Sequence, residues 1–269
     1  MTTTSLFKRF PTSDTYKGIV QAIEWYSTID ERCSKAYKER YGIKTLYVQQ
    51  QDVINTLSEI NKILIIEEHQ LSRACRMMAM VMQVCVSVTA MKAKMTPVLV
   101  DENDYKIGCF AHPFVLIIMP DDDVDPSILM DAYTLAHHTR IDFAVPNICV
   151  FFPGDEELQL LNSLVVCCSL NKLKQLIGQG LIGLSCVQRI IVDEPLYLDV
   201  AGFNDLRMIY RHPDMNVHVD AAFIGRSYTP FTTKNINDLF TYRLPYWNPH
   251  TVESRQASRD EWGAYADSL

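Results

Sequence analysis

The sequence FVLIIM, residues 114–119, is followed by the acidic loop PDDDVD at residues 120–125 and then by a helix signal that starts at Pro126. The apolar run does not alternate with polar residues, which is typical of a strand covered on both faces. Asp125 in front of Pro126 is typical of a helix N-cap followed by proline at the first helical position. These segments predict a buried strand that leads through a loop into a covering helix.

Similar segments occur along the rest of the chain. Short apolar runs, rich in β-branched or aromatic residues and bounded by turn residues, predict strands at 98–100, 107–110, 148–152, 187–192 and 217–219. Helix signals lie between them, at residues 126–139, 155–177, 204–211 and 234–242. Because strands alternate with helices, we expect an α+β or α/β fold, with an N-terminal helical part packed on a mixed sheet and further covering helices.

The first third of the chain has a helical pattern. Val53, Leu57, Ile60 and Leu64 fall at helical spacing, and residues 67–95 give the strongest helix signal, with apolar residues three or four apart and no Gly or Pro. This segment is rich in methionine, which is typical of an adaptable binding surface, of a core helix or of a helix in a dimer interface. We favour a core helix.

The division into domains follows these patterns. We expect a mainly helical part at residues 1–96, a mixed α/β part at residues 97–242 and an irregular, aromatic-containing tail at residues 243–269. The first two parts are also compatible with one shared core.

Several classes of protein are disfavoured. The N-terminal ten residues, MTTTSLFKRF, lack a secretory signal, and the longest uncharged apolar stretch, Met77 to Met91, is too short to span a bilayer. The eight cysteines contain no CxxC pair and mostly sit in apolar runs, which indicates reduced thiols and a cytoplasmic location. No GxSxG motif occurs, and GQGLIG at residues 178–183 has neither dinucleotide-binding spacing nor a phosphate-loop lysine.

Acidic residues are concentrated in one region. Residues 1–94 have 13 basic and 9 acidic residues, whereas residues 95–269 have 12 basic and 23 acidic residues. Twelve acids lie between Asp101 and Glu157, against Lys106 and Arg140. Such a region repels phosphate backbones and attracts basic partners or divalent cations, so direct nucleic-acid binding through it is disfavoured.

The first functional hypothesis follows from this acidity. We expect a non-enzymatic interaction protein, without a cofactor, that binds the Arg- or Lys-rich segment of a protein partner, such as a nucleic-acid-binding protein, and regulates or inhibits it. A virus-encoded effector would suit such a sequence. The expected partner-binding surface consists of Asp101, Glu102, Asp104, Asp121, Asp122, Asp123, Asp125, Asp155, Glu156 and Glu157.

The second hypothesis is an enzyme. Three apolar strand signals end in carboxylates, and the carboxyl ends of parallel strands meet at one edge of a sheet. Acids that converge there would bind Mg²⁺ for phosphoryl transfer or phosphodiester hydrolysis. The candidate ligands are Asp121, Asp123, Asp155 and Asp193. Helix capping is the competing explanation for most of these acids.

The third hypothesis is a structural subunit of a larger assembly. We expect a homodimer or other homo-oligomer, because aromatic residues in a polar tail usually pack on the body or on a second copy. The candidate interface residues are Met78, Met82, Trp247 and Trp262.

Overall fold

The fold is built on one large parallel sheet. The computed structural model describes residues 6–9, 20–21, 46–58, 63–94, 111–120, 125–138, 143–144, 146, 160, 163–216 and 219–241. Within these residues the sheet has seven strands in the order β1-β4-β9-β8-β5-β7-β6, and every neighbouring pair is parallel. These strands are β1 (Leu6–Arg9), β4 (Ile63–Glu67), β9 (Asp220–Gly225), β8 (Arg189–Asp193), β5 (Val115–Met119), β7 (Val165–Ser169) and β6 (Phe143–Ala144).

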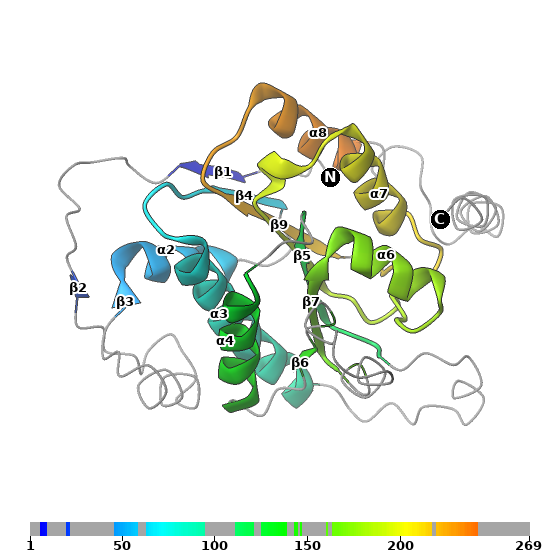
Figure 1. The fold of residues 1–269 in the computed structure, drawn as a ribbon, viewed down its shortest axis with the longest axis horizontal. Helices are drawn as coiled ribbons and strands as arrows, with labels where there is room; N and C mark the ends of the chain where they lie inside the picture. The colour runs from blue at the N-terminus through cyan, green and yellow to red at the C-terminus, as the bar shows by residue number, and fades with distance from the viewer. Residues whose placement is uncertain are drawn as a thin grey trace.

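Helices cover both faces of this sheet (Figure 1). Helices α2 (Val48–Leu57), α3 (Arg73–Lys94) and α4 (Pro126–His138) pack on one face. Helices α6 (Leu170–Gly178), α7 (Val200–Tyr210) and α8 (Pro230–Thr241) pack on the other, where the 3-10 helix η4 (Pro195–Tyr197) precedes α7. A two-stranded antiparallel sheet, β2 (Val20–Gln21) with β3 (Leu46–Tyr47), lies outside the large sheet. The sequence left α+β and α/β open, and the parallel pairing with helices on both faces makes the fold α/β.

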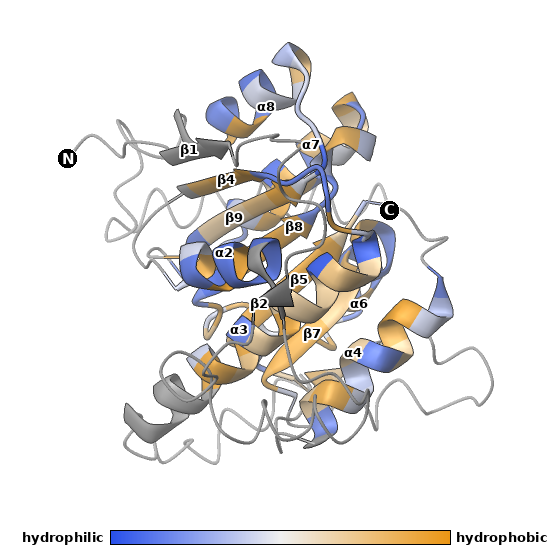
Figure 2. Ribbon diagram, turned by 90° about the vertical axis from the view of Figure 1, so that its left-hand side faces the viewer, coloured by the Kyte–Doolittle hydropathy of each residue, from blue (hydrophilic) through white to orange (hydrophobic). Residues whose placement is uncertain are grey.

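Strand β5 shows why an unbroken apolar run belongs in the middle of such a sheet. Val115, Ile117 and Met119 pack into the core under α3 and α4, whereas Leu116 and Ile118 pack into the core under α6 and α7. All five residues are buried, which confirms the prediction of a strand covered on both faces. In Figure 2 the strands β5 and β7 are coloured as hydrophobic, whereas much of α2 is hydrophilic.

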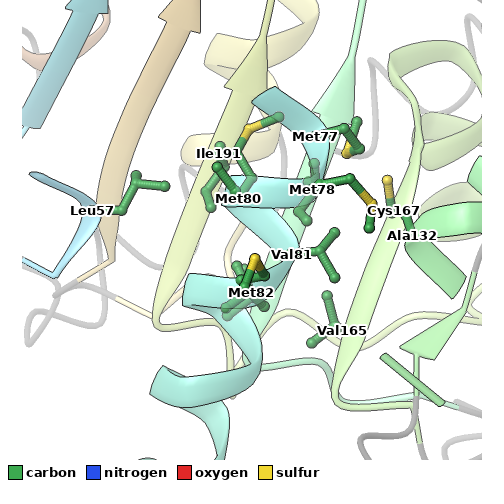
Figure 3. Close-up of a cluster of buried hydrophobic side chains, with 14 of the residues drawn as sticks. Leu57, Met77, Met78, Met80, Val81, Met82, Ala132, Val165, Cys167 and Ile191 are labelled. Carbon is green, nitrogen blue, oxygen red and sulfur yellow. The ribbon is translucent and has the colours of Figure 1, made fainter. Parts of the chain in front are cut away.

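The methionine-rich segment forms a core helix, as we favoured. Met77, Met80 and Met82 of α3 are fully buried and lie against the sheet, near Ile191 and Cys167 (Figure 3). Met78 is 7% exposed and Met82 is 0% exposed within a single chain. These two candidate interface residues are therefore core residues, and their side chains are not available to a second copy.

Two predicted helices are wrong because each contains a strand. The helix predicted at residues 155–177 is strand β7 from Val165 to Ser169 and then helix α6 from Leu170. The helical spacing through Leu64 is accidental, since α2 ends at Leu57 and Leu64 lies in strand β4. In both places a β-branched run pairs with neighbouring strands, and this tertiary pairing overrides a short helical pattern.

Other predicted segments are confirmed. Helices α4, α7 and α8 and strand β8 fall on predicted segments, whereas the strand expected at residues 217–219 begins at Asp220. The strands predicted at 98–100, 107–110 and 148–152 lie outside the described residues. The domain boundary near residue 96 stays a prediction, and the described part before it shares one sheet and one core with the part after it.

No disulfide joins the described cysteines, which are Cys75, Cys85, Cys167, Cys168 and Cys186. Among the helices of the described part, none has the length and apolar character that crossing a bilayer requires.

Candidate functional site

The carboxyl edge of the sheet holds the candidate site, at a point where the chain connections diverge. Strand β4 leads into α3 on one face, whereas its neighbour β9 leads into α8 on the other. The same divergence separates β8, which leads into α7, from β5, which leads into α4. In open α/β sheets, ligands bind beyond the carboxyl ends of strands at such switch points.

Strand β8 ends in two acidic residues at this edge. Asp193 is its last residue and is 0% exposed, and Glu194 follows as a buried residue. The backbone of Glu194 is left-handed, with φ 50° and ψ 55°, and its N–H donates to the carbonyl of Ile224 at 2.7 Å. A non-glycine residue in this conformation costs about 1–3 kcal/mol, and such strain concentrates at functional sites.

Gly225, the last residue of β9, lets Glu194 approach closely. A Cβ atom at this position would lie 3.2 Å from Cδ of Pro195 and 3.3 Å from Oε2 of Glu194. The same carboxylate oxygen accepts a hydrogen bond from the N–H of Arg226 at 3.2 Å. The end of β9 therefore holds the Glu194 side chain in a fixed orientation.

The first turn of α3 brings two arginines to the acid pair. Nε of Arg73 donates to Oδ2 of Asp193 at 2.7 Å. Nη2 of Arg76 donates to Oε1 of Glu194, and Nε of Arg76 lies 3.9 Å from Oδ1 of Asp193. Nη1 of Arg76 also donates to the carbonyl of Leu71 at 3.0 Å. The site is thus a buried set of two carboxylates and two guanidinium groups contributed by β8 and α3.

The charges of this set depend on one another. Burial lowers the pKa of Arg76 from its ordinary value, and Asp193 and Glu68 act in the opposite direction because their negative charges favour the cation. Its side chain is 0% exposed. Since burying a charged guanidinium without a partner costs free energy, the nearby carboxylates stabilise this cation in the core.

The loop between β4 and α3 contains a third carboxylate. Glu68 is buried, and its side chain accepts hydrogen bonds from the N–H groups of Gln70 at 2.8 Å and Leu71 at 2.6 Å. Its own N–H donates to the carbonyl of Gly225 at 2.9 Å. A loop that joins a parallel strand to a helix N-terminus is a common place for binding phosphate through backbone N–H groups. Here an anion of the chain itself accepts those hydrogen bonds.

Tyr228 lies beside the same edge, just after β9. Its hydroxyl group donates to the carbonyl of Ile66 in β4 at 3.1 Å. Burial raises the pKa of Tyr228 well above its ordinary value, and the negative charges of Asp193 and Glu67 add to this effect. The phenol therefore stays protonated and ties the segment after β9 to strand β4.

The acid pair does not fit a divalent cation in this arrangement. Mg²⁺ and Ca²⁺ need carboxylate oxygens that are free to coordinate them, whereas Oδ2 of Asp193 and both carboxylate oxygens of Glu194 accept hydrogen bonds from guanidinium or backbone N–H groups, and Oδ1 of Asp193 lies 3.9 Å from Nε of Arg76. Within the described residues, no group of three or more Asp, Glu, His or Cys side chains is arranged to bind a metal ion.

Most of the predicted site residues fall outside the described residues. Of the four candidate metal ligands, only Asp193 falls within the described residues, and the acids at 101–104, 121–123 and 155–157 do not. Asp125 is described and exposed, and it caps α4 by accepting a hydrogen bond from the N–H of Ser127 at 2.9 Å. This hydrogen bond lowers the pKa of Asp125 below its ordinary value. The predicted capping role is therefore observed for Asp125.

Sequence reasoning missed Glu68, Arg73 and Arg76. A signal for them exists in the sequence EEHQLSRACR at residues 67–76, where two arginines spaced for one helix face fall at the start of a helix. Cations are unfavourable at a helix N-terminus, so two of them there indicate nearby anions. The partner acids lie more than a hundred residues away, which is why the pairing could not be read from the sequence.

No protein-family model matches the sequence, and no curated protein matches it. Solved structures match the fold. The RNA helicase Prp28 from Chaetomium thermophilum bound to ADP is similar with a TM-score of 0.58 and 14% identity over 84% of this chain and 48% of that chain. A DEAD box protein from Methanococcus jannaschii gives a TM-score of 0.56 and 14% identity, over 82% of this chain and 53% of that chain.

A third similar structure is Saccharomyces cerevisiae Dbp5 L327V bound to Gle1 H337R and IP6, with a TM-score of 0.55 and 11% identity over 82% of this chain and 49% of that chain. The chain thus spans about half the length of the solved chains that it matches. At this level of identity the likeness is one of fold.

The likeness corrects the first functional hypothesis. The expectation of a non-enzymatic, virus-encoded regulator or inhibitor is wrong, because the similar structures include an RNA helicase, which is an enzyme, and a DEAD box protein. The structural neighbours agree better with the second hypothesis, a phosphoryl-transfer enzyme with carboxylates at the ends of its strands.

Proposed function

We propose that the chain is a nucleoside-triphosphate-dependent phosphoryl-transfer enzyme of the RNA-helicase type, with its site at the carboxyl edge of β4, β8 and β9. The observation that carries the proposal is the pair Asp193 and Glu194, which is buried at the end of a central strand and faces the first turn of α3. The left-handed backbone of Glu194 adds support, because the fold maintains a strained conformation there. Two structural neighbours were solved with ADP.

The charged groups of the site suit this chemistry. Phosphoryl transfer needs positioning of the phosphates and stabilisation of their negative charge more than it needs covalent help from the protein. Guanidinium groups such as those of Arg73 and Arg76 bind phosphate oxygens through paired hydrogen bonds. In the described arrangement they bind Asp193 and Glu194, so a nucleotide would compete with these carboxylates for the arginines. The Glu194 carboxylate, held by Arg76 and by the N–H of Arg226, would be able to orient the attacking water.

Hydrolysis of nucleoside triphosphates by the purified chain tests the proposal, with and without single-stranded RNA. Glu194→Gln should lower kcat by about 100-fold or more if the carboxylate assists the attacking water. Asp205→Asn is the matched control, because Asp205 forms an ion pair with Lys174 between α6 and α7, away from the candidate site. The proposal is rejected if the wild type hydrolyses no nucleoside triphosphate, or if Glu194→Gln retains the wild-type rate.

A protein partner is a further part of the proposal. Two structural neighbours were solved with protein partners, Gle1 in one and Gle1 with Nup159 in the other. The acid-rich segments between residues 101 and 157 suit a partner with an Arg- or Lys-rich segment. Self-association as a homodimer and a cytoplasmic location also remain proposals. A salt-dependent association rate with a basic partner would support this part, whereas salt-independent association would not.

A further inference from the structure

We infer that Arg73 and Arg76 take the place of a divalent cation on Asp193 and Glu194. The positive charge that balances these two carboxylates then comes from arginine side chains and not from a bound metal ion. The inference deepens the proposed function and uses the same site. It concerns the binding of metal ions by the unliganded protein, so it is tested without any measurement of nucleotide hydrolysis.

The geometry of the ion pairs supports the inference that arginines replace a metal ion. Oδ2 of Asp193 is 2.7 Å from Nε of Arg73, and Oδ1 of Asp193 is 3.9 Å from Nε of Arg76. Oε1 of Glu194 accepts a hydrogen bond from Nη2 of Arg76. A divalent cation would have to bind these oxygens within about 2.6 Å and would therefore lie beside two positive charges. The charges of both acids are thus balanced by arginine side chains of α3.

The two arginines differ in how easily they can leave. The side chain of Arg76 is 0% exposed and is also held by the carbonyl of Leu71. The side chain of Arg73 is 21% exposed and approaches Asp193 from the rim of the site. Arg73 is therefore the cation whose removal would uncover an oxygen of Asp193 while the rest of the core stays packed.

The N-terminus of α3 does not by itself favour the two arginines that lie there. Both lie in the first turn of α3, where the helix dipole disfavours positive charge. The negative charges of Asp193 and Glu68 act on Arg76 and favour its charged form. The acids at the ends of β8 and β4 are thus the groups that stabilise cations at this position.

Binding of Mn²⁺ to the purified full chain tests the inference, with the thermal midpoint and the electron paramagnetic resonance signal of free Mn²⁺ as readouts. The wild type should bind no Mn²⁺ saturably at millimolar concentration. Arg73→Gln should bind about one Mn²⁺ and show a midpoint that rises with Mn²⁺ concentration, because a ligand of the native state stabilises it. The double variant Arg73→Gln with Asp193→Asn should lose this binding.

A matched control shows whether removing the basic partner of any partly buried carboxylate creates a Mn²⁺ site, or whether only the removal of Arg73 does. Lys174→Gln removes the partner of Asp205, which is also a partly buried carboxylate, and should not create a Mn²⁺ site. Saturable Mn²⁺ binding by the wild type that Asp193→Asn abolishes would overturn the inference. A folded Arg73→Gln variant that binds no Mn²⁺ would overturn it as well. If Arg73→Gln does not fold, the wild-type measurement still decides.

The outcomes also separate this inference from the proposed function. A wild type that binds no Mn²⁺ and hydrolyses no nucleotide rejects the proposed function and leaves the inference in place. A wild type that hydrolyses nucleotide and binds Mn²⁺ through Asp193 supports the proposed function and rejects the inference.

Discussion

Arg76 is the residue on which the candidate site depends most. It is buried, and it connects the start of α3 to the acid pair after β8 and to the carbonyl of Leu71. A buried ion pair of this kind adds little net stability over an apolar pair, but removing one partner leaves an uncompensated charge and is strongly destabilising. This is why Arg73, which is partly exposed, and not Arg76, is the residue to substitute when the site is probed.

His212 gives a pH-dependent prediction at the same scale. Burial lowers the pKa of His212, although Asp214 opposes this, and its Nδ1 accepts a hydrogen bond from the N–H of Asp214 at 3.1 Å. Because the unfolded chain takes up the proton more readily, the free energy of unfolding should fall as the pH drops below the ordinary histidine value of about 6.5.

His212→Asn provides the measurement. Asparagine keeps an acceptor for the N–H of Asp214 and cannot be protonated, so its free energy of unfolding in urea should vary less between pH 7.5 and 5.5 than that of the wild type. Identical pH dependence in the two proteins would show that His212 does not cause it.

At the scale of elements, the unit β4, loop and α3 positions the site. The loop is short, and Glu68 satisfies the N–H groups of Gln70 and Leu71 that precede the helix. The end of β9 and the segment after it fix the same loop, because the carbonyl of Gly225 accepts a hydrogen bond from the N–H of Glu68 and the hydroxyl of Tyr228 donates to the carbonyl of Ile66. The loop after β4, the last residue of β9 and the segment after β9 therefore hold the arginines of α3 beside Asp193 and Glu194.

Helix α6 shows the energetic effect of a single cap. Ser169 is the last residue of β7 and the N-cap of α6, and its hydroxyl oxygen accepts from the N–H of Lys172 at 3.2 Å. Ser169→Ala should lower the free energy of unfolding by about 1 kcal/mol, because it leaves one N–H of the first turn without its partner.

Urea denaturation measures this effect, with Ser185→Ala, an exposed serine in the loop after α6, as the control that should change stability little. If Ser169→Ala is as stable as Ser185→Ala, the cap does not contribute as described.

At the scale of the whole molecule, the sheet connects both cores. Alternate residues of β5 point into the core under α3 and α4 and into the core under α6 and α7. Strand β8 is paired on both sides, with β5 and β9, whereas the two-residue strand β6 lies at the edge and, among the described strands, pairs with β7 alone. The central strands can therefore open only when both cores open.

Hydrogen exchange tests whether the central strands are more stable than the edge strand β6. Amides of β8, β5 and β9 should exchange only through global unfolding and respond strongly to urea, whereas amides of Phe143 and Ala144 in β6 should exchange through local opening. Equal protection of β6 and β8 across urea concentrations would contradict a sheet that is held together from its centre.

The sequence by itself determined the local features. The apolar run at residues 114–119, the Asp125 cap before Pro126 and the buried methionines of residues 77–82 follow from periodicity and capping chemistry, which act over a few residues. Where two local patterns competed, as at Leu64 and Val165, the helical reading was wrong because pairing with distant strands decided the outcome.

Only the tertiary structure decided the site. Arg73 and Arg76 are separated from Asp193 and Glu194 by more than a hundred residues, and the parallel order β4-β9-β8 brings them together at one edge. The charges of such residues are visible in the sequence, but which charge meets which depends on strand order. Strand order is set by the packing of the whole core, which no local pattern encodes.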